Sequence, residues 1–133
     1  MMSAVPQTRV PPEDLGAPAL RTFFRIAEMW GLTNEQQRVL LGRPGRSTFF
    51  KWKKGGDAAL PRDTLERISY VLGIYSALQV LLPDPASADR WIQRPNSAPL
   101  FGNRSALERM LSGNVADLFI VRQYLDAQRG GWA

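Results

Sequence analysis

The chain has 133 residues, 44% of them apolar and 22% charged, and no apolar run long enough to span a bilayer, which predicts a compact globular protein. It contains no Cys and no His, which excludes disulfides, sulfur or imidazole metal ligands, and Ser-His-Asp or Cys-His catalysis, so we expect neither an enzyme nor a cofactor. The net charge of +5 is focused, because six basic residues and no acidic one lie between positions 38 and 54, and this favours a polyanionic partner such as nucleic acid.

The first segment of the chain is rich in proline and holds few residues that a core could bury. We expect residues 1–18 to form a disordered leader, with order beginning at Pro18 in the first turn of a helix. Apolar residues then recur at spacings of three and four, which predicts a helix that ends at Gly31. These apolar residues are Leu20, Phe23, Phe24, Ala27 and Trp30.

Two short helices are predicted next. Thr33 and Gln36 have the spacing of a capping box, which opens a helix over residues 33–41. A second short helix, over residues 45–54, is basic and ends at a pair of glycines. The two helices are separated by a turn that contains glycine and proline.

The longest predicted element follows. Asp63 and Glu66 have the spacing of a second capping box, and apolar residues keep a helical spacing from there to Pro83. Shorter helices are expected after Pro83, around Leu107 and after Asn114. Because no strand alternation or hairpin turn is present, the expected fold is all-α, with two lobes that share the long helix.

The short helix, turn and short basic helix have the geometry of a helix-turn-helix, whose second helix enters the major groove of DNA. We expect this pair to be packed against the first and the fourth predicted helices by Leu40, Phe49 and Trp52. Arg46 would reach a guanine edge, while hydroxyl and lysine side chains would contact phosphates. The candidate DNA-binding residues are Arg43, Arg46, Ser47, Thr48, Lys51, Lys53 and Lys54.

A solvated basic face on a helical core is the alternative interpretation of these charges. The turn contains Pro44, and two bulky aromatics, Phe49 and Phe50, are adjacent in the presumed reading helix. Both cannot face the core equally, so one is expected to be partly exposed, where it could contact a partner or a second copy. DNA binding would then be weak, or would become firm only in a complex.

The C-terminal half contains the pattern W-x-x-x-P-N-x-x-x-L-x-G from Trp91 to Gly102, then a short Leu-containing helix, a Gly, and a final helix that ends in Gly and an aromatic residue. This pattern resembles the toxin-binding domain of the Xre/MbcA/ParS antitoxin family. The segment Trp52-Lys-Lys-Gly-Gly resembles the end of that family's helix-turn-helix, and the resemblance covers about residues 20–133. We expect a structural role, holding the binding surface, for Trp91, Pro95, Asn96 and Gly102.

The resemblance implies a bacterial, cytoplasmic type II toxin–antitoxin module. The partner it implies is a RES-domain toxin, which consumes NAD or transfers ADP-ribose from it, and whose active site the antitoxin occludes with its C-terminal lobe and tail. The tail residues implied in toxin binding are Arg129, Gly130, Gly131, Trp132 and Ala133. A Gly-Gly hinge that presents Trp132 suits a cleft built for a planar ring, although a frayed terminus with Trp132 folded back on its helix is the alternative.

We therefore expect a leader over residues 1–18, a helix-turn-helix lobe over 19–75 and a toxin-binding lobe over 76–133. The expected partners are the toxin, operator DNA bound for autoregulation, and either a second copy of the chain or a toxin–antitoxin hetero-oligomer. No metal and no membrane is expected among them.

Two other functions remain open at this point. The first is a stand-alone transcriptional regulator whose C-terminal lobe only dimerises it, which the absence of a neighbouring toxin gene would favour. The second is an enzyme built on paired carboxylates, with Asp84 and Asp89 or Asp117 and Asp126 as the available pairs. Both pairs have the positions of helix caps and exposed helix faces, so this second function is set aside.

Overall fold

The structure is a computed structural model that describes residues 12–55 and 59–131, and every regular element in these residues is helical. An isolated bridge between Pro95 and Ser105 is the only strand-like pairing in this part of the chain. The expected all-α fold is therefore confirmed. The elements are α1 (Pro12–Met29), α2 (Asn34–Leu40), α3 (Arg46–Lys53), α4 (Arg62–Leu81), α5 (Pro85–Arg90), the 3-10 helix η1 (Trp91–Gln93), α6 (Ala106–Met110) and α7 (Val115–Gly131).

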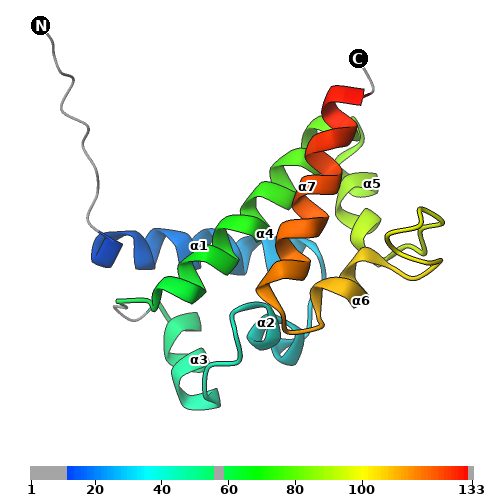
Figure 1. The fold of residues 1–133 in the computed structure, drawn as a ribbon. Coiled ribbons are helices and arrows are strands. Elements are labelled where there is room, and N and C mark those ends of the chain that lie inside the picture. The colour runs from blue at the N-terminus through cyan, green and yellow to red at the C-terminus, as the bar shows by residue number, and fades with distance from the viewer. Residues whose placement is uncertain (1–11, 56–58, 132–133) are drawn as a thin grey trace, which may run out of the picture.

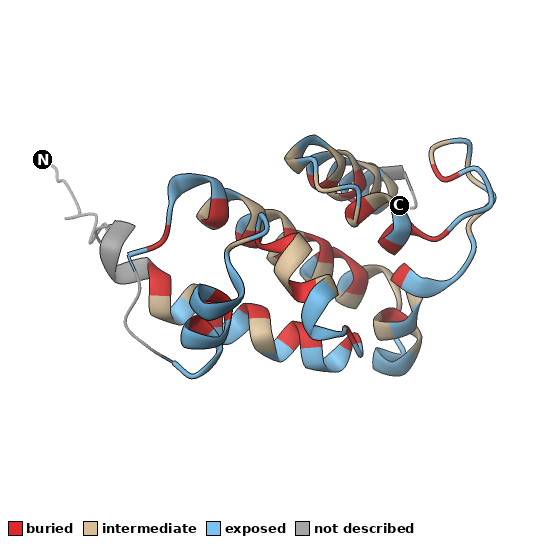
Figure 2. Cartoon of the chain, turned by 90° about the horizontal axis from the view of Figure 1, so that it is seen from below, coloured by how far each residue is buried: buried red, intermediate tan, exposed pale blue. Residues whose placement is uncertain are grey.

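The long helix α4 is the axis of the molecule. Figure 1 shows that α7 runs alongside α4, and that α1 packs across it. In Figure 2 the buried residues lie on the faces that these helices turn toward one another. Five apolar side chains of α4 are buried there: Ile68, Val71, Ile74, Ala77 and Leu78. One continuous core therefore passes through both lobes, and the prediction that a long helix joins them is confirmed.

The start of α2 forms as predicted. The Thr33 hydroxyl oxygen accepts a hydrogen bond from the Gln36 backbone N–H at 3.1 Å, and the Gln36 side-chain oxygen accepts one from the Thr33 N–H at 2.9 Å. This reciprocal pair satisfies two backbone donors that a helix start would otherwise leave open. The entry into the helix-turn-helix is thus held by local chemistry.

The capping box predicted for the long helix is wrong. The helix begins at Arg62, with Pro61 in the N-cap position at φ −55°, and no side chain caps it. Asp63 lies inside the first turn, where its carboxylate accepts a hydrogen bond from Arg67 Nε at 2.9 Å. Because proline fixes φ near the helical value, the turn at Pro61 starts the helix and Asp63 pairs along it instead.

The predicted leader is too long. Helix α1 begins at Pro12 rather than Pro18, so residues 12–18 are helical and Pro18 lies inside the helix. Proline is favoured in the first turn of a helix because the backbone N–H groups of that turn have no partner within the helix, so the N–H that proline lacks is not needed there. Pro12 occupies this position. Within the helix, Pro18 costs one backbone hydrogen bond. Residues 1–11 of the predicted leader lie outside the described residues.

No helix among the residues that the structure describes is both long and apolar enough to cross a lipid bilayer.

Candidate functional site

The basic helix α3 is attached to the core by one face. Leu40 of α2 is fully buried, and Phe49 and Trp52 of α3 are 1% and 8% exposed. The Phe49 ring packs edge-on against Phe24 of α1, with ring centroids 5.8 Å apart. The burial of these three residues and the contact with α1 are as predicted, and they turn the opposite face of α3 toward solvent.

The turn between α2 and α3 is held by Arg38. Its guanidinium donates to both carboxylate oxygens of Glu35, at 3.2 and 2.8 Å, and to the backbone carbonyl of Pro44 at 2.9 Å. The hydrogen bonds from Arg38 keep the pKa of the Glu35 carboxyl below its usual range. The position of Arg38 in the basic run does not reveal this role, although its spacing of three residues from Glu35 is typical of an ion pair along a helix.

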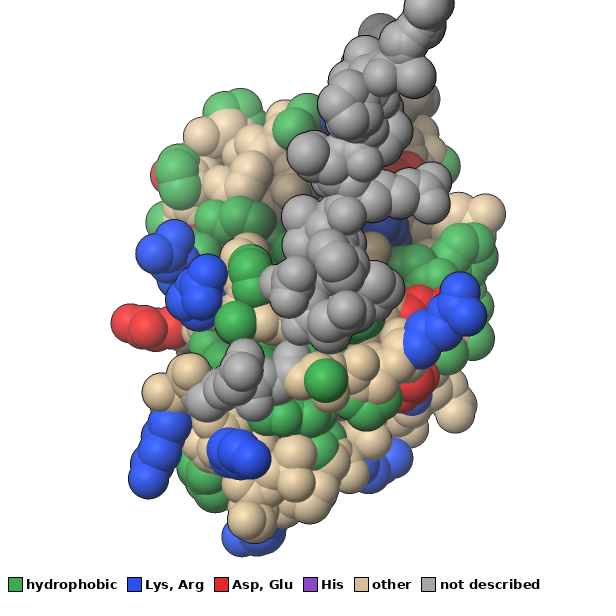
Figure 3. Space-filling view, turned by 90° about the vertical axis from the view of Figure 1, so that its left-hand side faces the viewer, with side chains coloured by type: hydrophobic (Ala, Val, Ile, Leu, Met, Phe, Trp, Pro, Cys, Tyr) green, Lys and Arg blue, Asp and Glu red, His purple; other side chains and the backbone are tan. Residues whose placement is uncertain are grey.

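The outward face of α3 carries most of the candidate DNA-binding residues. Arg46, Ser47, Thr48, Lys51 and Lys54 are all exposed. Among the described residues, no carboxylate lies within ion-pair distance of the three cations in this set. Figure 3 shows Lys and Arg side chains projecting from the lower part of the molecule, where α3 lies in Figure 1. This face therefore has unpaired positive charge in a form that phosphates can reach.

Two of the predicted residues are directed elsewhere. The Lys53 amine donates to the Asn34 side-chain oxygen and lies 5.9 and 5.8 Å from the ring centroids of Phe24 and Phe49. Arg43, whose φ is +60°, extends away from α3, so that a Cβ added at Gly113 would meet its guanidinium. The structure thus places Lys53 on the side of α3 that faces α1 and α2, and Arg43 against the turn between α6 and α7.

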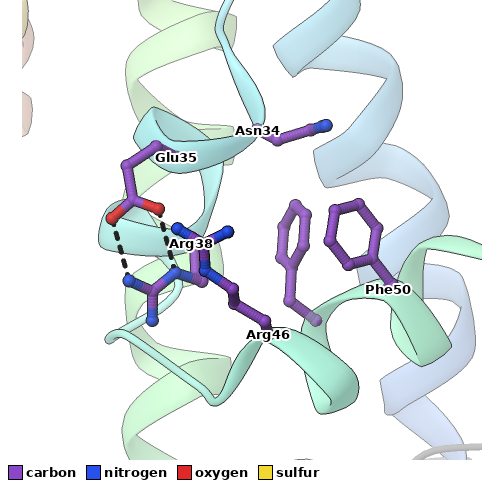
Figure 4. Close-up of a pocket in the computed structure, with 6 residues that line it drawn as sticks. Asn34, Glu35, Arg38, Arg46 and Phe50 are labelled. Carbon is purple, nitrogen blue, oxygen red and sulfur yellow. Dashed lines mark hydrogen bonds and ion pairs between the residues drawn. The ribbon is translucent and has the colours of Figure 1, made fainter.

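A shallow pocket of about 220 Å³ lies between α2 and α3 (Figure 4). The Phe50 ring stands at one side of it and the Arg46 side chain at the other. Its remaining lining residues are Asn34, Glu35, Arg38 and Phe49. The exposed member of the aromatic pair is Phe50, which is 44% exposed.

In the C-terminal lobe, an aromatic cluster holds the loop between η1 and α6. Trp91 stacks on Tyr124 of α7 with centroids 6.4 Å apart, and Phe101 packs edge-on against both rings, at 5.9 and 5.2 Å. Phe101 is buried, so the loop is attached to α7 through its middle. Edge-on and offset stacked rings are the favoured arrangements of aromatic pairs.

The motif residues of this loop hold it closed by backbone contacts. The Asn96 side-chain oxygen accepts from the Ala98 N–H at 2.9 Å, and the Asn96 backbone donates to the Arg104 carbonyl at 3.0 Å. Gly102 has φ +57°, a conformation that glycine adopts without steric cost. Together with the bridge from Pro95 to Ser105, these contacts hold the loop between η1 and α6 in shape. The positions of Trp91, Pro95, Asn96 and Gly102 therefore fit a structural role.

The loop has a further tie that the sequence did not indicate. Arg109 of α6 donates to the Asp117 carboxylate and to the Leu100 carbonyl, both at 2.9 Å. This side chain joins the loop, α6 and the start of α7. Its two partners are eight and nine residues away, outside the helical spacings that would have predicted a pair.

The predicted Gly-Gly hinge is wrong. Helix α7 continues through Gly130 to Gly131, and the Arg129 guanidinium lies 4.0 Å from the Asp126 carboxylate on the same helix. Glycine costs only about 1 kcal/mol in a helix, and α7 is held by its packing along α4, so the last turn forms despite it. Trp132 and Ala133 lie outside the described residues.

The acidic pairs have structural partners. Asp84 accepts hydrogen bonds from Ser87 as the N-cap of α5, and Asp117 accepts from Arg109 and Ser112. Within residues 12–55 and 59–131, no three acidic side chains are grouped so as to hold a metal ion.

Comparison with known proteins adds two family matches and one relative. Residues 12–73 match the antitoxin Xre-like helix-turn-helix domain, and residues 77–131 match the antitoxin Xre/MbcA/ParS C-terminal toxin-binding domain. The two matched ranges meet inside α4. The uncharacterized protein y4oB of Sinorhizobium fredii (strain NBRC 101917 / NGR234) is 54% identical over 123 residues, which cover 92% of this chain and 88% of that protein. The chain therefore belongs to the Xre/MbcA/ParS antitoxin family, as a non-enzymatic protein with a helix-turn-helix domain and a toxin-binding domain.

Proposed function

We propose that this antitoxin neutralises a RES-type toxin, which consumes NAD or transfers ADP-ribose from it, by occluding the toxin's active site in the bacterial cytoplasm. The observation that carries the proposal is the match of residues 77–131 to a toxin-binding domain. The motif from Trp91 to Gly102 supports the RES class, through the resemblance that it implies. The exposed end of α7, with Arg129 and Gly130, supports occlusion by the last turn and the residues after it.

The test is co-expression of the antitoxin with the product of the neighbouring gene, purification through a tag on that product, and an NAD-consumption assay. We expect a stable complex whose NAD turnover is suppressed, and turnover that returns when the antitoxin is removed by unfolding and the toxin is refolded alone. If a complex forms but the partner, once refolded alone, does not consume NAD, the RES class would be contradicted. The absence of any complex would contradict the proposal as a whole.

We further propose that the outward face of α3 binds operator DNA upstream of the antitoxin's own gene. Exposure and unpaired charge support Arg46 as a reader of a guanine edge, and Ser47, Thr48 and Lys54 as phosphate contacts. Two reading helices, from a second copy or from a toxin–antitoxin assembly, would match a palindromic operator. The operon would then be regulated by its own product.

Arg46→Ala is expected to weaken operator binding by about fivefold to a hundredfold, because a bidentate contact from arginine to guanine contributes roughly 1–3 kcal/mol. Lys51→Ala should weaken binding at every sequence and reduce the slope of log K against log salt by about one. Fluorescence anisotropy at several salt concentrations measures both effects. Arg90→Ala is the matched control, because Arg90 is an exposed arginine of α5, which lies away from α3 (Figure 1). Binding that does not change with salt would contradict the assignment of the basic face.

A further inference from the structure

The outward face of α3 contains one large apolar side chain among its cations. Phe50 follows Arg46 by four residues and precedes Lys54 by four, so helical spacing places all three on one side of the helix. The Phe50 side chain is 44% exposed, while Phe49, its neighbour in the chain, is 1% exposed. A helix that only needed positive charge here would gain nothing from an exposed phenylalanine.

The Phe50 ring is also held in place. It packs edge-on against Phe49, with ring centroids 5.1 Å apart and an interplanar angle of 74°. Phe49 is itself fixed against Phe24 of α1. Phe50 therefore packs on a buried aromatic ring at the edge of the pocket between α2 and α3 (Figure 4). This packing restricts the Phe50 side chain before binding, so the loss of side-chain entropy on binding a ligand is smaller.

The charges around Phe50 select the class of ligand. Arg46 and Lys51 of α3 are exposed, as is Lys54 directly after it, and α3 contains no acidic residue. A symmetric contact with a second copy through this face would bring like charges together, which disfavours association. A polyanion is attracted to it instead. Within the major groove of DNA, the apolar group on a base edge is the C5-methyl of thymine, which side chains such as phenylalanine contact.

We propose that Phe50 is a specificity-determining residue that contacts the C5-methyl group of a thymine in the major groove. The inference rests on the proposed binding of DNA by α3. Lys51 and Lys54 supply attraction that is independent of sequence, and Phe50 adds a preference for thymine at one position of each half-site. The partly exposed aromatic that counted against DNA binding in the sequence is then part of the reading surface.

The experiment uses the full-length chain and a pool of random-sequence DNA duplexes. The sites that the wild-type protein selects are sequenced, and each thymine of the selected site is then replaced in turn by uracil, which lacks only the methyl group. We expect uracil at one position of each half-site to weaken wild-type binding about fourfold, the effect of exposing one buried methyl group. Phe50→Ala should bind thymine and uracil at that position equally, and Phe50→Leu should keep part of the preference.

Phe119→Ala is the matched control, because Phe119 lies on α7 and is 45% exposed, close to the exposure of Phe50. It should show the wild-type preference for thymine. Circular dichroism and light scattering on each variant establish that the fold and the oligomeric state are kept.

The outcomes separate the two proposals. If the wild-type protein selects no sequence and binds no duplex, the proposed DNA-binding function fails. If it selects a site but uracil has no effect, or weakens wild type and Phe50→Ala alike, DNA binding stands and the role of Phe50 is overturned. A change of oligomeric state in Phe50→Ala, with the selected site unchanged, would overturn it in favour of a protein contact.

Discussion

Removal of residues 129–133 is expected to abolish neutralisation of the toxin and to leave DNA binding unchanged. Among the described residues of α7, Leu125 is the last that is buried, and Arg129 and Gly130 of the deleted segment are exposed, so the described part of the deletion takes nothing from the core. The end of α7 and the helix α3 lie at opposite ends of the molecule (Figure 1). Arginine and tryptophan are the side chains most often found as interface anchors, each contributing about 2 kcal/mol or more, so their joint loss should weaken the complex more than about a hundredfold.

Growth of cells that express the toxin measures this effect, with operator binding measured in parallel. Gln123→Ala is the control, since Gln123 is an exposed residue of α7 that precedes the deleted segment, and it should protect cells as the wild type does. Trp132→Ala alone shows whether the aromatic side chain carries the effect. A truncated chain that still protects cells would refute occlusion by the last residues of the chain.

The parts of the fold that follow from a few neighbouring residues could be predicted from the sequence. The capping box of Thr33 and Gln36 needs only four residues and forms as expected. The buried positions of Phe49 and Trp52 follow from helical spacing. The capping box predicted at Asp63 does not form, because the helix begins after Pro61, two residues earlier. The spacing of Asp63 and Glu66 does not reveal this competing start.

Composition was a weaker guide than helical context at both ends of the described chain. Proline and glycine suggested a leader up to residue 18 and a hinge at 130–131, yet the structure has helix at 12–18 and through Gly131. A proline inside a helix costs about 3 kcal/mol and a glycine about 1 kcal/mol, and the packing of a long helix along α4 can compensate for either cost. The energy of that packing depends on residues far away in the sequence.

The candidate DNA-binding residues fall into two groups, those placed by helical spacing alone and those placed by contacts with residues distant in sequence. Positions on the outward face of α3 follow from the positions of its two buried residues. Lys53 and Arg43 lie off this face, because the Lys53 amine donates to Asn34 and the Arg43 guanidinium lies beside Gly113, and both of these partners are distant in sequence. Arg43 thus extends from the helix-turn-helix domain to the turn between α6 and α7 of the toxin-binding domain, and no local pattern could have indicated this position.

Phe49→Ala is expected to lower the free energy of unfolding by about 3–5 kcal/mol, the usual cost of removing a buried phenylalanine side chain. The ring is 1% exposed and packs edge-on against Phe24, so its loss leaves a cavity where α3 meets α1. Phe50→Ala, by contrast, should cost about 1–2 kcal/mol, because the residue is 44% exposed and its removal leaves no enclosed cavity. The two changes delete the same atoms from adjacent positions. They therefore distinguish the effect of packing α3 on the core from the effect of the side chains on its outward face.

Urea unfolding followed by tryptophan fluorescence measures both values, since Trp52 lies on the same helix as the two phenylalanines. An equal decrease in the free energy of unfolding for the two variants would contradict the placement of Phe49 inside the core and Phe50 outside it. If the losses differ as expected, Phe49→Ala should weaken binding to every DNA sequence in proportion to the unfolded fraction. A change in which sequence is bound should then follow from Phe50→Ala alone, in a protein that is clearly more stable than Phe49→Ala.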